Sequence, residues 1–92
     1  MVERGDNTIL VGKKPPMAYV LAAITQFSDG QDEIHIKARG RCISNAVDVS
    51  QIIKNKFIKD AKITNVEIGT ETIESEGKQM NVSTIDITIR RS

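Results

Sequence analysis

The chain has 92 residues, of which 39% are hydrophobic and 27% charged, and its formal net charge is +1. This length suits one compact domain, and this composition is typical of a globular chain. No apolar run approaches the roughly 18 to 20 residues needed to cross a bilayer, and the initial MVERGDN lacks the apolar core of a secretory signal. We therefore expect a cytoplasmic protein with a flexible N-terminus over 1–6, one domain over 7–92 and no association with membranes.

The sequence offers few residues for catalysis or metal binding. Cys42 is the only cysteine and His35 the only histidine, so neither an intramolecular disulfide nor a cysteine- or histidine-rich zinc site can form. His35 falls on the polar side of an alternating segment, where we expect it to be solvated, and no nucleophile–base pair can be assembled around it. We expect no enzymatic activity, no catalytic residue, no cofactor and no metal.

The first half of the chain predicts a strand, a helix and a second strand. Residues 8–11 form a short β-rich run that ends at Gly12 and the turn-like segment KKPP. Apolar residues then recur at the spacing of a buried helical face, at Met17, Val20, Leu21, Ile24 and Phe27. The segment Ser-Asp-Gly at 28–30 stops this helix, and alternation from residue 33 predicts a strand with Ile34, Ile36 and Ala38 on its apolar side.

The second half predicts a helix and two more strands. Ser44 is positioned to cap a helix whose apolar face comprises Ala46, Val49, Ile53 and Phe57. Residues 63–68 read as a strand, 70–80 as a polar connection and 82–90 as a strand of alternating isoleucines. The fold class is α+β, in the order β-α-β-α-β-β, with two helices on one face of a four-stranded mixed sheet. Because helices connect the early strands, we expect the early strand pairs to be parallel. We expect the last two strands to form a long hairpin.

Basic and acidic residues are separated along the chain. Residues 37–59 contain six basic residues and one acidic residue, whereas residues 67–76 contain four acidic residues and no basic one. A net charge of +1 argues against a generic polycation, so nucleic-acid binding would depend on where these charges lie in the fold.

Two short basic segments follow predicted strands. Lys13 and Lys14 lie between a glycine and two prolines, which limits the entropy lost on contact with a phosphate. Arg39 and Arg41 flank a glycine, and their guanidinium groups suit phosphate oxygens. Each segment alone fits an ordinary solvated surface, but adjacent parallel strands would bring the two together. We expect the basic end of the second helix, with Lys54, Lys56 and Lys59, to converge with them. Tyr19 is the only aromatic residue outside the apolar faces, so we expect contacts to the phosphate backbone rather than to bases.

Three segments resemble the Alba family of archaeal chromatin proteins, and together they span roughly residues 7 to 91. They are NTILVGKKPPMAYVLAAITQF, IHIKARGRCISNAVDVSQIIKNKF and NVSTIDITIR. The resemblance implies the same β-α-β-α-β-β fold, which the family shares with the C-terminal domain of a bacterial translation initiation factor. It further implies a homodimer that coats and compacts double-stranded DNA with little sequence preference, associated with the chromosome. Because the family includes RNA-binding members, RNA in ribonucleoprotein complexes is the alternative ligand.

The resemblance also assigns roles to individual residues. The expected nucleic-acid-binding residues are Lys13, Lys14, Arg39, Arg41, Lys54, Asn55, Lys56 and Lys78. Lys13 and Lys14 match paired lysines of which one is acetylated in some relatives, and Phe57 matches a residue that packs dimers side by side on DNA.

This sequence departs from the family pattern at two places. Asn45 stands where many relatives carry a lysine, and the hairpin tip holds Glu71, Glu74 and Glu76 with Lys78 as its only base. Both departures remove positive charge, so we expect weaker DNA binding that is lost at a lower salt concentration than in a strongly basic relative. A third hypothesis is a protein-interaction module whose basic loops are only solvated.

Overall fold

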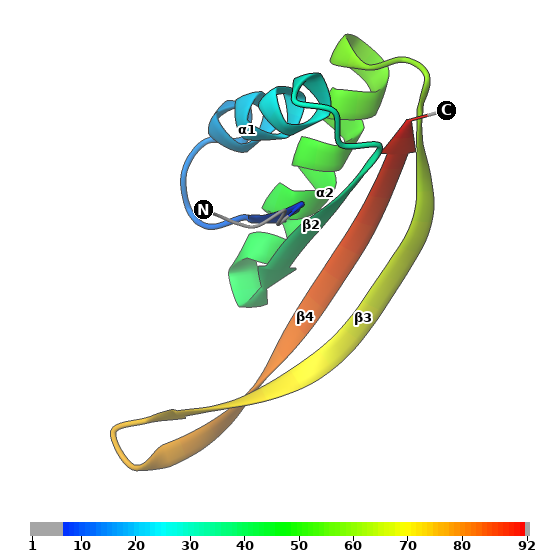
Figure 1. The fold of residues 1–92 in the computed structure, drawn as a ribbon. Coiled ribbons are helices and arrows are strands. Elements are labelled where there is room, and N and C mark those ends of the chain that lie inside the picture. Colours follow the sequence, from blue (N-terminus) through cyan, green and yellow to red (C-terminus); the bar gives the residue numbers. More distant parts are fainter. Residues whose placement is uncertain (1–6, 92) are drawn as a thin grey trace.

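The protein is an α+β fold of two layers, described here by a computed structural model for residues 7–91 (Figure 1). The elements in chain order are β1 (Thr8–Leu10), α1 (Pro16–Ser28), β2 (Glu33–Arg39), the 3-10 turn η1 (Gly40–Cys42), α2 (Ile43–Ile52), the π-helical turn η2 (Ile53–Phe57), β3 (Ala61–Ser75) and β4 (Lys78–Arg91). The order and type of the predicted elements are confirmed. The flexible N-terminus expected at 1–6 lies outside the described residues. None of the helices within 7–91 is long and apolar enough to span a bilayer.

The four strands form one mixed sheet in the order β1-β2-β4-β3. β1 is parallel to β2, whereas β4 is antiparallel to both β2 and β3. The expectation of parallel early pairs is therefore correct for β1 and β2 but wrong for β2 and β3, because β4 lies between them. The reason is burial: β4 carries three buried isoleucines and occupies the centre, whereas most side chains of β3 are exposed and suit an edge.

The core lies between the helices and one face of the sheet. Ile34 and Ile36 of β2 lie directly opposite Ile89 and Ile87 of β4, and all four are buried. Both helices cover this face and leave the other uncovered (Figure 1). From the helices, the buried side chains are Val20, Ala23, Phe27, Ala46, Val49, Ser50 and Ile53. The apolar face of each helix thus packs against the apolar side of β2 and β4, as the sequence patterns predict.

The buried face of α1 is narrower than predicted. Val20, Ala23 and Phe27 are buried, but Met17 is largely exposed and Leu21 is 58% exposed. The helix packs over β1, β2 and α2 near one side of the sheet, so only a single stripe of its surface is covered. Ala23 belongs to that stripe although its side chain is small, and the spacing of the large apolar residues does not indicate its burial.

α2 differs from the prediction at both ends. Ser44 does not cap it: η1 continues directly into the helix, Cys42 occupies the capping position and no side chain caps the helix. At the other end Phe57 leaves the apolar face and is 47% exposed. The last turn is π-helical, with the amide of Ile58 bonded to the carbonyl of Ile53 at 2.8 Å. This wider turn rotates Phe57 away from the buried face of α2, of which Ile53 is the last residue.

The predicted polar connection at 70–80 is wrong, because β3 continues to Ser75 and β4 begins at Lys78. The two strands pair without interruption to Ser75 and Lys78, and only Glu76 and Gly77 turn the chain. Both turn residues have positive φ, 53° and 78°, as a type I′ hairpin turn requires. The outer part of this hairpin extends away from the helices (Figure 1). Its side chains face water on both sides, which explains why strand residues there are polar.

Replacing Ile36 with alanine is expected to lower the free energy of unfolding by about 2–5 kcal/mol, because the residue is fully buried in a packed core. Leu21→Ala serves as the control and is expected to cost less than about 0.5 kcal/mol, since that side chain lies mostly in water. Urea unfolding at one fixed protein concentration measures both variants. Equal losses would place Leu21 in the core and contradict the packing described above.

Candidate nucleic-acid interface

The two predicted basic segments lie at the same edge of the sheet. β1 and β2 are parallel, so both chains leave the sheet at that edge, and the amide of Val11 continues their ladder with a 2.8 Å bond to the carbonyl of Lys37. The four side chains, which we call the basic edge, are Lys13, Lys14, Arg39 and Arg41. All four are exposed. The structure therefore confirms that the sheet topology brings these segments together.

The loop that carries Lys13 and Lys14 is tied down by two helical side chains. Nδ2 of Asn45, in the first turn of α2, donates hydrogen bonds of 2.9 Å to the carbonyl oxygens of Gly12 and Lys14. The amide of Lys14 donates a 3.2 Å bond to the hydroxyl of Tyr19 in α1. Two prolines follow, one of them at the first position of α1. The loop is thus ordered before any ligand arrives.

Asn45 and Tyr19 hold the loop, a role that the sequence pattern did not indicate. The sequence indicates only that Asn45 lacks the positive charge of a lysine, whereas in the structure it joins the loop to α2 across 31 to 33 residues of sequence. The helical spacing predicts that Tyr19 lies outside the apolar face, but its side chain is half-buried against the core and its hydroxyl is bonded to the loop. The Asn45 contacts depend on how α2 packs beside the loop, which no local pattern shows, whereas the Tyr19 contact spans only five residues and depends on the turn that leads into α1.

The two arginines of the basic edge differ in their surroundings. Arg41 lies in η1, directly after Gly40 with φ of 60°, and has no acidic partner among residues 7–91. Arg39 ends β2, and its Nη1 pairs with Oε1 of Glu71 on β3. One arginine is therefore open to a phosphate, whereas the other already contacts a carboxylate.

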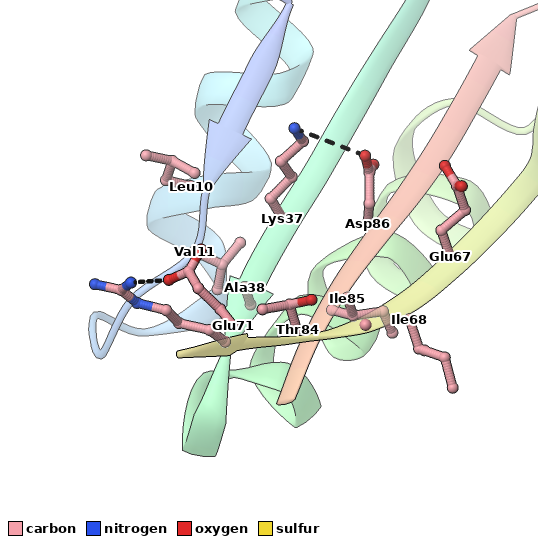
Figure 2. A pocket seen from close by; sticks show the side chains of 12 residues that line it. Leu10, Val11, Lys37, Ala38, Glu67, Ile68, Glu71, Thr84, Ile85 and Asp86 are labelled. Atoms are coloured by element: carbon pink, nitrogen blue, oxygen red, sulfur yellow. Dashed lines mark hydrogen bonds and ion pairs between the residues drawn. The ribbon is translucent and has the colours of Figure 1, made fainter. Parts of the chain in front are cut away.

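A groove crosses the uncovered face of the sheet beside Arg39 (Figure 2). Its charged lining residues are Lys37, Arg39, Glu67, Glu71 and Asp86. Lys37 Nζ lies 3.8 Å from Oδ2 of Asp86, so both cations of the groove have carboxylate neighbours. Leu10 flanks the groove on β1. This mixture of charges makes the groove less cationic than the basic edge itself.

His35 belongs to a polar network on the same face rather than to a solvated surface. Its Nδ1 lies 3.1 Å from Oδ1 of Asp86 and 3.2 Å from Oγ1 of Thr88, and its Nε2 lies 3.3 Å from Oε2 of Glu33. The ring is half-buried, which corrects the expectation of a solvated histidine. No group of three potential metal ligands occurs within residues 7–91. The network ties β2 to β4.

The remaining predicted contacts lie away from the basic edge, so the expected convergence of the basic helix end with the two loops is wrong. Lys54, Asn55 and Lys56 occupy η2, and at about 1.5 Å per residue they lie some 15–20 Å along the helix from its start near Arg41. The amide of Asn55 donates a 3.1 Å bond to Oε1 of Gln51. Lys78 lies beside the hairpin turn, in the part of the hairpin that extends away from the helices (Figure 1). Within one chain these residues do not join Lys13, Lys14, Arg39 and Arg41.

Asn45→Ala is expected to loosen the loop, because two carbonyl oxygens lose their protein donor. At about 1 kcal/mol per net hydrogen bond, the free energy of unfolding should fall by roughly 1–2 kcal/mol, and amide exchange at residues 12–14 should quicken. Hydrogen exchange and urea unfolding measure these effects. Asn55→Ala is the matched control, since its amide bonds only an exposed glutamine side chain. Unchanged exchange in Asn45→Ala would show that Tyr19 and the prolines hold the loop without Asn45.

Comparison with known proteins identifies the family. Residues 7–70 match the family model named Alba. The protein named DNA/RNA-binding protein Alba from Methanocella arvoryzae is 51% identical over 87 residues, which cover 94% of this chain and 91% of that relative. The protein of the same name from Thermoplasma acidophilum is 52% identical over 86 residues, covering 94% of this chain and 97% of that relative.

Solved structures show the same arrangement. The structure named Alba from Thermoplasma volcanium has a TM-score of 0.88 at 53% identity and covers 92% of this chain and 100% of that chain. The ALBA1 structure from Trypanosoma brucei shares the fold, with a TM-score of 0.76 at 21% identity over 97% of this chain and 72% of that chain. The four-stranded mixed sheet with two helices on one face, the matched family model and the identity to archaeal relatives agree, and the chain belongs to the Alba family.

Proposed function

We propose that this protein is a non-enzymatic nucleic-acid-binding protein that binds double-stranded DNA as a homodimer, mainly through phosphates and with little sequence preference. The observation that carries the proposal is the basic edge, where the exposed Lys13, Lys14, Arg39 and Arg41 follow two parallel strands at one edge of the sheet and Asn45 holds the first loop. The archaeal relatives are named DNA/RNA-binding proteins, which supports the same ligand class here. Coating and compaction of the chromosome, and hence a location on it, are the cellular role we propose.

The basic edge suits phosphate oxygens better than base edges. Lys13 and Lys14 present exposed ammonium groups from a loop whose backbone is held by Asn45 and Tyr19, so little conformational entropy is lost on binding. Arg41 offers a planar fork that can hold two phosphate oxygens. Such contacts fix position on a duplex without reading its sequence. Acetylation of Lys13 or Lys14 would remove one positive charge from this surface and weaken binding.

A second copy of the chain would supply the homodimer. Val66 and Ile68 of β3 lie opposite the buried Ile87 and Ile85, so they project from the same face of the sheet as the core. Yet the two side chains are 52% and 82% exposed, because the helices do not reach over this part of β3. An apolar strip that continues the core into water is the kind of surface that a symmetric dimer buries.

The residues at the end of α2 fit contacts between neighbouring dimers. Phe57 is 47% exposed beside Lys54, Asn55 and Lys56, about 20 Å from the start of the helix. We propose that Phe57 packs dimers side by side, while the adjacent lysines and Asn55 reach the same duplex. Lys78 is the remaining proposed contact, and the glutamates around it make the hairpin a weak one.

RNA is the second candidate ligand, and the charge of the hairpin favours it. Glu71, Glu74 and Glu76 repel the phosphates of a duplex that the hairpin would follow, whereas the basic edge needs only a short stretch of backbone. Competition between duplex DNA and structured RNA of equal length decides between the two. A tenfold or greater preference for DNA would exclude a primary role with RNA.

Salt dependence tests phosphate binding directly. The slope of log affinity against log salt for a duplex should correspond to about four to eight phosphates, at roughly 0.9 per phosphate. Lys14→Ala should weaken binding and reduce the slope by about 0.9 per contacting subunit. Lys62→Ala removes the same charge from an exposed position at the opposite end of the sheet and should leave the slope unchanged. A slope near zero in the unsubstituted protein would refute the mechanism.

Light scattering tests the homodimer. The unsubstituted protein should give about twice the chain mass of 10.2 kDa. Ile68→Lys should shift it to the single-chain mass, since a charge in a closed apolar interface is costly to bury. Leu21→Lys introduces the same charge at an exposed apolar position of α1 and should leave the mass unchanged. A dimer that survives Ile68→Lys would move the interface to another surface.

A further inference from the structure

The pair between Arg39 and Glu71 joins two strands that are not neighbours. Arg39, the last residue of β2, is paired with Thr84 of β4, and Thr84 is paired on its other side with Gly69 of β3. Glu71 follows two residues later on β3 and therefore projects from the same face as that row. The side chain of Arg39 thus pairs with a carboxylate two strands away in the sheet, at the base of the hairpin.

Gly69 leaves the path between Arg39 and Glu71 open. A Cβ atom at Gly69 would lie 3.2 Å from Oγ1 of Thr84, so a larger residue would crowd the row to which Arg39 belongs. Because residue 69 is glycine, β3 contributes no side chain beside Thr84 that could block the path from Arg39 to Glu71. The sheet register and one missing side chain therefore place this carboxylate within reach of the guanidinium.

The pair occupies a guanidinium group that a phosphate would otherwise contact. Carboxylates and phosphates bind the arginine fork with the same donors, so both cannot use the same N–H groups at once. Arg39 and Glu71 remain 61% and 51% exposed, and exposed ion pairs are weak enough to exchange for another anion. Lys13, Lys14 and Arg41 have no acidic partner within residues 7–91, so Arg39 is the exception at the basic edge.

We propose that Glu71 is an internal competitor for the phosphate contact of Arg39 and thereby lowers the affinity of this chain for nucleic acid. The inference rests on the proposed function, because it concerns the same basic edge. A phosphate that approaches Arg39 must displace the Glu71 carboxylate, which then lies close to the bound phosphate and repels it. Glu71 is thus a determinant of affinity that lies outside the basic edge. It belongs to β3, which contributes no cation to the basic edge.

Glu71→Gln tests the competition. The substitution keeps the size of the side chain but removes the charge, so Arg39 becomes available to phosphate, and duplex affinity should rise about two- to fivefold, the range expected for one exposed ion pair. Glu67→Gln is the matched control. Glu67 lies on the same face of β3, two residues to the other side of Gly69, and has no basic partner among the described residues. It reports the effect of removing a nearby negative charge without breaking the pair.

A double-substitution cycle isolates the contribution of the pair. In an Arg39→Ala background, Glu71→Gln should change duplex affinity no more than Glu67→Gln does, because the arginine for which it competes is gone. Equal gains from Glu71→Gln and Glu67→Gln in the native background would overturn the proposal. Weaker binding in Glu71→Gln would overturn it too, since Glu71 would then orient Arg39 toward the phosphate.

Titration with inorganic phosphate separates this inference from the proposed function. The Nε–Hε signal of Arg39 in an NMR spectrum follows the guanidinium directly, whether or not a duplex binds. Half-saturation at a lower phosphate concentration in Glu71→Gln than in the unsubstituted and Glu67→Gln proteins supports competition, and equal values overturn it. Failure of the unsubstituted protein to bind a duplex would overturn the proposed function, whereas the competition between Glu71 and phosphate for Arg39 would still be decided by this titration.

Discussion

The parallel pairing of β1 with β2 is the constraint on which the rest of this surface depends. Parallel strands leave a sheet at the same edge, so two loops separated by more than twenty residues of sequence emerge side by side. Without this pairing, the lysines after β1 and the arginines after β2 would be unrelated exposed charges. The amide of Asn45 then completes the arrangement by joining the first loop to the helix that follows the second. Backbone topology thus concentrates charge in a chain whose net charge is +1.

The acidic residues are arranged by the same sheet. β4 lies between β2 and β3, so the acidic strand is held two strands away from the arginine that ends β2, at a distance that its long side chain can span. Lys37 has a similar neighbour in Asp86, and His35 lies between two carboxylates. The uncovered face therefore balances its own charges, while the loops at the edge do not. The loops of the basic edge are therefore cationic, whereas the uncovered face of the sheet is nearly neutral.

Much of the fold was predictable because burial imposes a period on the sequence. Alternating isoleucines in β2 and β4 and the helical spacing of Val20, Phe27, Ala46 and Val49 reflect a single core, so the order of elements could be inferred without coordinates. The predictions failed where burial no longer selects the side chains. The outer hairpin is held by backbone hydrogen bonds in water, so its strands carry polar residues and read as a loop. Phe57 kept the helical spacing, but a π-helical turn rotated it outward.

The sequence by itself determined the class of fold, the family resemblance and the identity of the exposed cations, because these depend on local pattern and on residue type. Only the tertiary structure decided which cations lie at the same edge of the sheet and which are already paired. Lys13, Lys14, Arg39 and Arg41 share an edge, whereas the lysines of η2 and Lys78 lie elsewhere. Asn45 supports a loop, and Glu71 pairs with Arg39. These contacts join residues about thirty positions apart, and their existence depends on strand order and helix packing, which no local stretch of sequence encodes.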